Sequence, residues 1–216
     1  KLDSEQLCDK FKELTPQYKL DKVDPFTFLS VINSKVHNRK DNRLVWVTKA
    51  GKIFNIDTTS ITDLNGLPNI DPTKAWFGAD NTDFTDKLYN VARELYEKQE
   101  ISKEQINEIL PITNVAAAKL SIVLFMCYPN KYFPLDKKTL EYADQVLKDN
   151  KNTEQFIRMQ DVLEKQFLDK EPYQVSYEAW KQSKEGEETN SMKDKVSQNT
   201  LAGNLAELLK NTKNII

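Results

Sequence analysis

Apolar residues recur every three or four positions along most of the chain, and this spacing predicts a mainly helical protein. The first example is Leu7, Phe11 and Leu14, which follow Ser4, a residue that can cap a helix. Asp24-Pro25 marks a second start, because aspartate accepts hydrogen bonds from free amides and proline suits the first helical position. The same spacing predicts further helices over residues 84–95, 102–110, 116–126, 136–147, 153–168 and 176–183.

Residues 44–56 fit two different structures. β-branched and aromatic residues flank a three-residue turn that contains Gly51, a pattern typical of a β-hairpin. The same stretch carries Leu44, Val47 and Phe54 at positions that one helix face could bury. Local propensity favours the hairpin. The predicted fold class is therefore mainly α, with at most one small β-hairpin, which would make the fold α+β.

Two long stretches lack apolar periodicity and divide the chain. Residues 57–83 are rich in Asp, Asn, Thr, Pro and Gly, and they predict a long loop anchored by Trp76-Phe77. Residues 184–198 are polar and charged and predict a linker. Beyond it, Asn199 can cap a helix that carries Leu201, Leu205 and Leu208. We predict a helical domain over residues 1–183, a linker over 184–198 and the start of another unit over 199–216.

Charge is distributed unevenly along the chain, although the formal net charge is only -2. Residues 35–52 have a local balance of +5, and residues 53–89 have a balance of -4. A local basic patch can hold phosphates while acidic surface elsewhere keeps the protein soluble, although the same charges also fit a solvated face. The candidates for phosphate contact are Lys35, Arg39, Lys40, Arg43, Lys49 and Lys52.

Catalytic and cofactor motifs are largely missing from the sequence. His37 is the one histidine, and Cys8 and Cys127 have no metal-type spacing, so we expect no metal site. The five glycines are scattered rather than gathered in a phosphate-binding loop, so we expect no nucleotide cofactor and no enzymatic activity in this chain alone. There is no apolar run of membrane-spanning length and no signal-like start, so we expect a cytoplasmic protein without a membrane partner.

Residues 106–136 resemble the helix-hairpin-helix of DNA-repair glycosylases. That family's Gly-Val-Gly hairpin corresponds to Asn114-Val115-Ala116, in which asparagine can adopt the positive φ of the missing glycine. In such hairpins, amides at the start of the second helix hold a DNA phosphate. The resemblance therefore implies a second DNA contact at Asn114, Ala116 and Lys119.

The catalytic residues of the glycosylases do not carry over. Their nucleophilic lysine falls on Ala118, one residue before Lys119 and about 100° away around a helix. Asp136 matches the family's acid, but aspartate at the start of a predicted helix is ordinarily an N-cap. We therefore expect no base-removing activity. An enzyme acting on a base stays open as a rival, which predicts an activity that disappears in Asp136→Asn.

Several short motifs resemble the N-terminal domains of McrB-like AAA+ restriction proteins. These domains carry Asp-Pro-Phe-Thr-Phe followed by Phe-Asn-Arg-Gly, and Asn33 matches that asparagine while Ser34 and Lys35 depart from Arg-Gly. The other similar segments are 24–28, 42–44, 66–68, 76–77, 129–136 and 176–180. Residues 208–216 resemble the helix and strand that lead into a Walker A loop, which implies that residues 199–216 are the start of a truncated AAA+ motor domain. The resemblance favours a helix over residues 42–50.

The McrB-like resemblance implies a recognition domain. It implies duplex DNA as the partner, in some members with a modified cytosine. In the full-length protein it implies an AAA+ ring that hydrolyses GTP or ATP, together with a separate nuclease subunit of a phage-defence system. Asn33, Asn38 and Trp76 are the candidates for reading bases. The rival function is a protein-interaction or assembly module without DNA affinity, which the acidic residues 57–86 favour.

Overall fold

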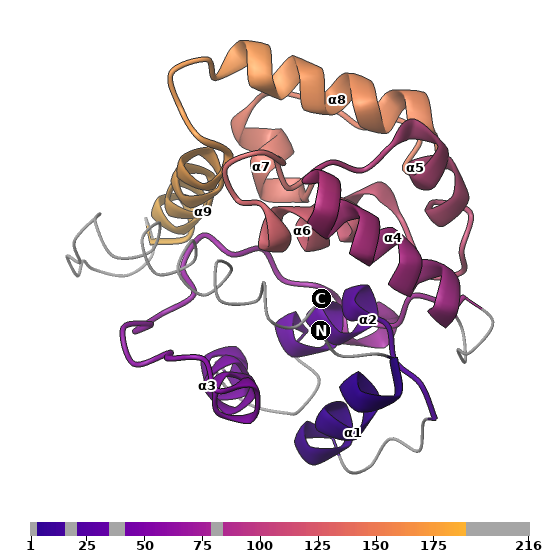
Figure 1. The fold of residues 1–216 in the computed structure, drawn as a ribbon. Coiled ribbons are helices and arrows are strands. Elements are labelled where there is room, and N and C mark those ends of the chain that lie inside the picture. Colours follow the sequence, from indigo (N-terminus) through magenta and orange to yellow (C-terminus); the bar gives the residue numbers. More distant parts are fainter. Residues whose placement is uncertain (1–3, 16–20, 35–41, 79–83, 189–216) are drawn as a thin grey trace.

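A computed structural model describes residues 4–15, 21–34, 42–78 and 84–188 of the chain. The described residues form a mainly helical domain, and the mainly α prediction is confirmed (Figure 1). One isolated parallel bridge joins Ser34 to Ile70. The helices are α1 (Ser4–Leu14), α2 (Pro25–Asn33), α3 (Asn42–Phe54), α4 (Thr85–Lys98), α5 (Lys103–Ile109), α6 (Ala117–Cys127), α7 (Lys137–Tyr142), α8 (Thr153–Gln166) and α9 (Pro172–Glu188), with a 3₁₀ turn at Pro72–Lys74.

Local capping signals place the helix starts correctly. Asp24 caps α2 by accepting from the Thr27 amide at 2.9 Å. The predicted capping box is present, because Ser102 and Gln105 each bond the other's backbone amide. Asp136 caps α7, as its residue type suggested. These caps depend on residues close in sequence, and for that reason the sequence alone reveals them.

Residues 42–54 form helix α3, so the preference for a hairpin is wrong and the helix favoured by the McrB-like resemblance is correct. Val47 and Ala50 are buried on one face of this helix. Gly51 lies inside the helix rather than in a turn, and a Cβ built on it would come 2.4 Å from Thr58 Cγ2. Because α3 contacts α1 and α2, tertiary burial of its inner face overrides the local β propensity.

The core is formed by aromatic side chains from several helices and by two helices that are buried along most of their length. Every residue of α2 is buried, and α6 is buried from Ala117 through Met126 apart from Ala118. Phe11 of α1 contacts Phe28 of α2, which in turn packs edge-on against Phe54 of α3. Through this contact chain, α3 is attached to the body of the domain from one side.

Residues 55–78, which we call the strap, connect α3 to the body without regular structure except for one short turn. In Figure 1 the strap runs from α3 toward α9 before it turns toward α4. Much of it is buried, so its backbone polar groups need partners inside the protein. Side chains from the helices supply partners near the middle of the strap. Ser176 donates to the Gly66 carbonyl at 2.6 Å, and Asn33 donates to the Pro68 carbonyl at 2.7 Å.

The C-terminal end of the strap is held by hydrogen bonds around the Trp76–Phe77 peptide. Lys119 Nζ donates to the Trp76 carbonyl, and the Phe77 amide donates to Thr27 Oγ1 at 3.3 Å. The Gly78 amide donates to the Thr113 carbonyl at 3.0 Å. The predicted anchoring of this loop by Trp76-Phe77 is therefore confirmed, and the anchor is polar as well as aromatic.

The last described helix is longer than expected. Helix α9 begins at Pro172 and continues through Glu188, so the first five residues of the predicted linker are helical. Its first half is held against α7, and the Tyr142 hydroxyl donates to Glu178 at 2.5 Å. The rest of the predicted linker and the predicted helix after Asn199 lie outside the described residues.

Candidate nucleic-acid interface

Helix α3 carries the cationic surface that best matches the predicted phosphate-binding patch. Val45, Lys49 and Lys52 are exposed and lie along one side of α3, and we call these three residues the α3 face. Lys49 Nζ lies 5.7 Å from the centre of the half-buried Trp46 ring. Among the described residues, no carboxylate lies within ion-pairing distance of Lys49 or Lys52. The two charges are therefore available to an anionic partner.

The opposite side of α3 is fixed to the domain. Lys10 of α1 donates to the Ile53 carbonyl at 3.0 Å, near the end of α3, and its ammonium lies over the Phe54 ring. A cation at this end is also favourable for the helix dipole. The start of α3 is held by Arg43, which reaches both α2 and the strap. These contacts hold α3 at both ends, so its outer face is presented on a rigid element.

Arg43 and Asn33, predicted to contact DNA, make structural contacts within the protein. Arg43 Nη1 donates to Asn33 Oδ1 at 3.1 Å and to the Leu67 carbonyl at 2.8 Å. Asn33 is 1% exposed, so it cannot reach a base edge. Both side chains satisfy buried polar groups where α2, α3 and the strap meet. The sequence signal was the long loop itself, whose buried carbonyls require donors from elsewhere in the chain.

Lys119 is likewise buried, which contradicts its predicted contact with a DNA phosphate. The side chain is 6% exposed, and its ammonium donates to the Lys74 and Trp76 carbonyls, each at 2.6 Å. The same group lies 4.5 Å from the centre of the Phe77 ring. Trp76 is half-buried and packs edge-on against Phe11, so it is placed as part of the aromatic core and not as a base-stacking platform.

The turn between α5 and α6 has the predicted backbone shape but not the predicted free amide at the helix start. Asn114 adopts φ 62 and is exposed, which confirms the positive φ predicted for this residue. Ala116 precedes α6 as its N-cap residue and is half-buried. The Ala117 amide, however, donates to the Asn150 carbonyl at 2.8 Å. A phosphate would have to displace this bond to be held by the Ala117 amide.

Lys151, next to Asn150, stabilises the turn between α5 and α6. Lys151 donates to the Leu110 and Ile112 carbonyls at 2.8 and 2.9 Å, where α5 ends. Sequence reasoning missed this residue and Ser176, because both bind carbonyls about forty or more positions away in the chain. Four further predicted residues, Lys35, Asn38, Arg39 and Lys40, lie outside the described residues.

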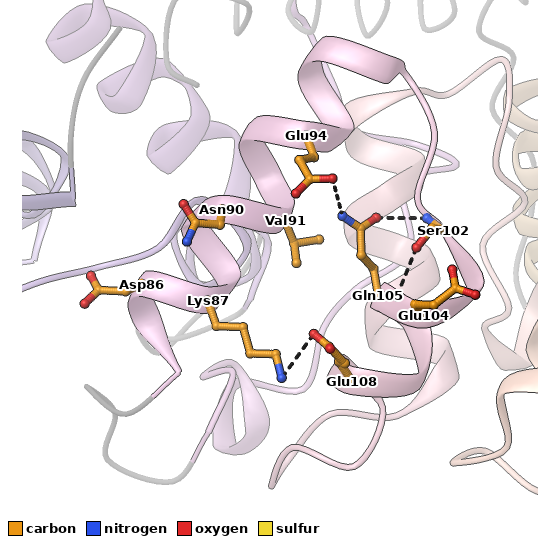
Figure 2. A pocket seen from close by; sticks show the side chains of 9 residues that line it. All are labelled: Asp86, Lys87, Asn90, Val91, Glu94, Ser102, Glu104, Gln105 and Glu108. Carbon is orange, nitrogen blue, oxygen red and sulfur yellow. Dashed lines mark hydrogen bonds and ion pairs between the residues drawn. The ribbon is translucent and has the colours of Figure 1, made fainter.

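A polar groove of about 510 Å³ lies between α4 and α5 (Figure 2). Its rim carries four carboxylates, from Asp86, Glu94, Glu104 and Glu108, against one ammonium. Lys87 pairs with Glu108 at 3.1 Å across the groove, and Glu94 accepts from Gln105. Lys22 also pairs with Asp86 at 3.1 Å, and Lys98 pairs with Glu94 at 2.8 Å. The remaining negative charge of the groove is therefore small and lies at Glu104, which suits a cationic group better than a phosphate.

Two ionisable groups are buried on either side of the strap's Trp76–Phe77 peptide. Burial raises the pKa of Asp24 to about 6, against the opposing effect of its hydrogen bonds with Thr27. Burial lowers the pKa of Lys119 to about 7, and the nearby Asp24 charge opposes that change. Since Thr27 also accepts from the Phe77 amide, a chain of contacts links the carboxyl group to the strap. The centre of the fold is therefore sensitive to protonation.

Replacing Asp24 with asparagine is expected to remove part of the pH dependence of stability. The folded pKa of Asp24 lies above its ordinary value of 3.8, so the folded state binds the proton more tightly between about pH 4 and 6. Wild-type stability therefore contains a contribution that falls by about 2 kcal/mol as pH rises through this window. Asparagine retains the cap but cannot ionise. Urea unfolding of both proteins from pH 4 to 7 measures the difference, and parallel curves would contradict this account.

Metal and membrane sites do not emerge from the described part of the chain. Within residues 4–15, 21–34, 42–78 and 84–188, no group of three or more His, Cys, Asp or Glu side chains is arranged to hold a metal ion. None of the described helices combines the length and the apolar content needed to cross a bilayer.

Comparison with known proteins gives a family but no activity. A search of curated proteins and a search of solved structures returned no match to the chain. One family model matches residues 4–182, which include the helices from α1 to most of α9 and the whole strap. The match covers well over half of the sequence. The chain therefore belongs to the DUF8425 family, described as a domain of unknown function.

Proposed function

We propose that this domain binds duplex DNA through the α3 face, as the target-recognition module of a McrB-like restriction protein. The observation that carries the proposal is that Lys49 and Lys52 are exposed on a fixed helix and have no acidic partner among the described residues. Neutralising phosphates with such lysines releases counterions and supplies most of the sequence-independent affinity for DNA. The chain adds three more cations shortly before α3, at Lys35, Arg39 and Lys40.

The McrB-like part of the proposal is supported by where the similar motifs meet. Asn33, Arg43 and the Gly66–Pro68 segment come from three of these motifs, and hydrogen bonds join them. Ser176, from a fourth motif, donates to Gly66. Motifs far apart in sequence thus share one junction at the strap. This junction supports the proposed resemblance, while DNA contact would come from the α3 face. Recognition of a modified cytosine belongs to the same proposal.

Reversing the two α3 charges should weaken DNA binding for all sequences. In Lys49→Glu/Lys52→Glu, affinity for duplex DNA is expected to fall by about 10- to 100-fold at low salt, because two attractive contacts become repulsive. Neutral Lys49→Gln/Lys52→Gln should reduce the slope of log affinity against log salt by roughly 1–2. Fluorescence anisotropy with a labelled duplex at several salt concentrations measures both quantities.

A matched pair of exposed lysines on another element provides the control. Lys137→Glu/Lys148→Glu changes the same number of charges near α7, where no DNA contact is proposed, and should leave most of the affinity. Circular dichroism establishes that all variants are folded. Absence of wild-type binding at low salt, or an equal loss in both pairs, would reject DNA binding through α3.

A protein-docking role is the second candidate, and the groove between α4 and α5 favours it. Its carboxylates would accept lysine or arginine side chains of a partner, such as the nuclease subunit implied by the McrB-like resemblance. This function predicts a complex that dissociates in Glu104→Lys and persists in Lys49→Glu/Lys52→Glu. Size-exclusion chromatography of the mixed proteins distinguishes the two surfaces.

A further inference from the structure

We infer that α3 enters the major groove of DNA, with Val45 packed against the C5-methyl group of a thymine. This inference rests on the proposed DNA binding and goes beyond it, because lysine–phosphate contacts alone carry no sequence information. The α3 face contains an apolar residue as well as two cations. Val45 is 49% exposed, although Val47 and Ala50 on the same helix are buried.

The spacing along α3 places the valine and the lysines on one side of the helix. Residues 45, 49 and 52 are separated by four and three positions, so they fall within an arc of about 60°. Along the axis, Lys49 lies about 6 Å from Val45 and Lys52 about 10 Å. A helix that turns this side toward DNA brings all three residues to the duplex together. The lysines are long enough to reach the phosphates at the groove edge while the short valine faces the groove floor.

The shape of α3 selects the major groove. B-form DNA admits an α-helix into its major groove, about 12 Å wide, whereas the minor groove is about half that width. The position of α3 at the periphery of the domain, beside α1 and α2, leaves its outer side uncovered by any described helix (Figure 1). Residues Lys10 and Arg43 hold the helix from behind, so insertion needs no rearrangement of the helix.

The chemistry of Val45 selects the base. Its side chain has no hydrogen-bonding atom, so it can gain affinity at a base edge only by apolar contact. Among the four natural bases, thymine alone presents an apolar group in the major groove, its C5-methyl. Placing Val45 against this methyl removes apolar surface of both partners from water. The α3 face therefore predicts a preference for thymine over uracil in otherwise identical duplexes.

Alternating dA-dT and dA-dU duplexes test this inference, since they differ only by the methyl groups in the major groove. For the wild-type protein, removing the methyl is expected to weaken binding about 4-fold, the equivalent of one buried methylene. Val45→Ser removes both γ-methyl groups, which would make the contact with the thymine methyl, and the 4-fold ratio should fall to about 1. Anisotropy titrations at one salt concentration give the ratio for each protein.

The control variant is Leu168→Thr, which removes another exposed apolar side chain, beyond the end of α8. It should keep the wild-type ratio. Equal affinity of the wild type for both duplexes, or an unchanged ratio in Val45→Ser, would overturn the inference. If the Lys49→Glu/Lys52→Glu variant still loses affinity in that case, the proposed DNA binding survives. If no duplex binds at all, both proposals fail, and the exposed Val45 then belongs to a protein contact.

Discussion

Lys119→Met is expected to lower the free energy of unfolding by about 2–4 kcal/mol. Methionine has nearly the volume of lysine, so the change removes hydrogen bonds rather than packing. The Lys74 and Trp76 carbonyls, each 2.6 Å from Lys119 Nζ, would lose their donor inside the protein. Burying an unsatisfied polar group costs about 1–3 kcal/mol, and two are created here. Denaturant unfolding followed by circular dichroism measures the loss.

The matched control is Lys148→Met, because Lys148 is exposed and follows α7 without a contact to the strap. The free energy of unfolding of Lys148→Met should stay within about 0.5 kcal/mol of wild type.

Wild type and Lys119→Met should also differ in how their free energy of unfolding depends on pH. Since burial lowers the folded pKa of Lys119 to about 7, the unfolded state binds the proton more tightly above that pH. Wild-type stability therefore gains a contribution as pH rises from about 7, and Lys119→Met lacks it. A Lys119→Met protein as stable as wild type would show that the strap is held without this residue.

Arg43→Met is expected to destabilise the protein by about 2–3 kcal/mol without changing the salt dependence of DNA binding. The arginine donates to Asn33 Oδ1 and to the Leu67 carbonyl, and its removal leaves both acceptors without that donor. A phosphate contact would behave in the opposite way. Loss of one phosphate contact reduces the salt slope by roughly 0.9 and affects stability little.

Lys52→Met provides the control for Arg43→Met on the same helix. Lys52 is exposed, so its removal should leave stability nearly unchanged while reducing the salt slope. Unfolding curves and anisotropy titrations on the two variants thus separate a fastening residue from a binding residue. A reduced slope in Arg43→Met with wild-type stability would restore the phosphate contact expected from sequence.

Residues that act over three or four positions were predictable from the sequence. The caps at Asp24, Ser102 and Asp136 depend on neighbours within one helical turn. The positive φ of Asn114 follows from a property of asparagine itself. Helical periodicity likewise predicted the mainly α class. Each of these features depends on a few neighbouring residues, so it can be predicted without knowledge of the fold.

The candidate site was only partly predictable from the sequence. The charged group of a lysine or arginine can face water, bind a ligand or donate to a buried carbonyl. Lys49 and Lys52, which the charge pattern named as candidates for phosphate contact, are exposed. The same pattern also included Arg43, and the hairpin resemblance included Lys119, both of which bond to the strap. Their partners lie 24 and 45 positions away. The neighbouring residues in the sequence do not distinguish an exposed cation from one that bonds to the strap.

The sequence by itself determined the helical class, most helix starts and the existence of a long loop anchored at Trp76-Phe77. Tertiary structure settled the choice between hairpin and helix for residues 42–54, since burial of Val47 and Ala50 against neighbouring helices outweighs a modest β preference. It also decided which polar side chains fasten the strap. The physical reason is that buried backbone carbonyls of an irregular segment must find donors, and only the packed arrangement of helices determines which donors are near.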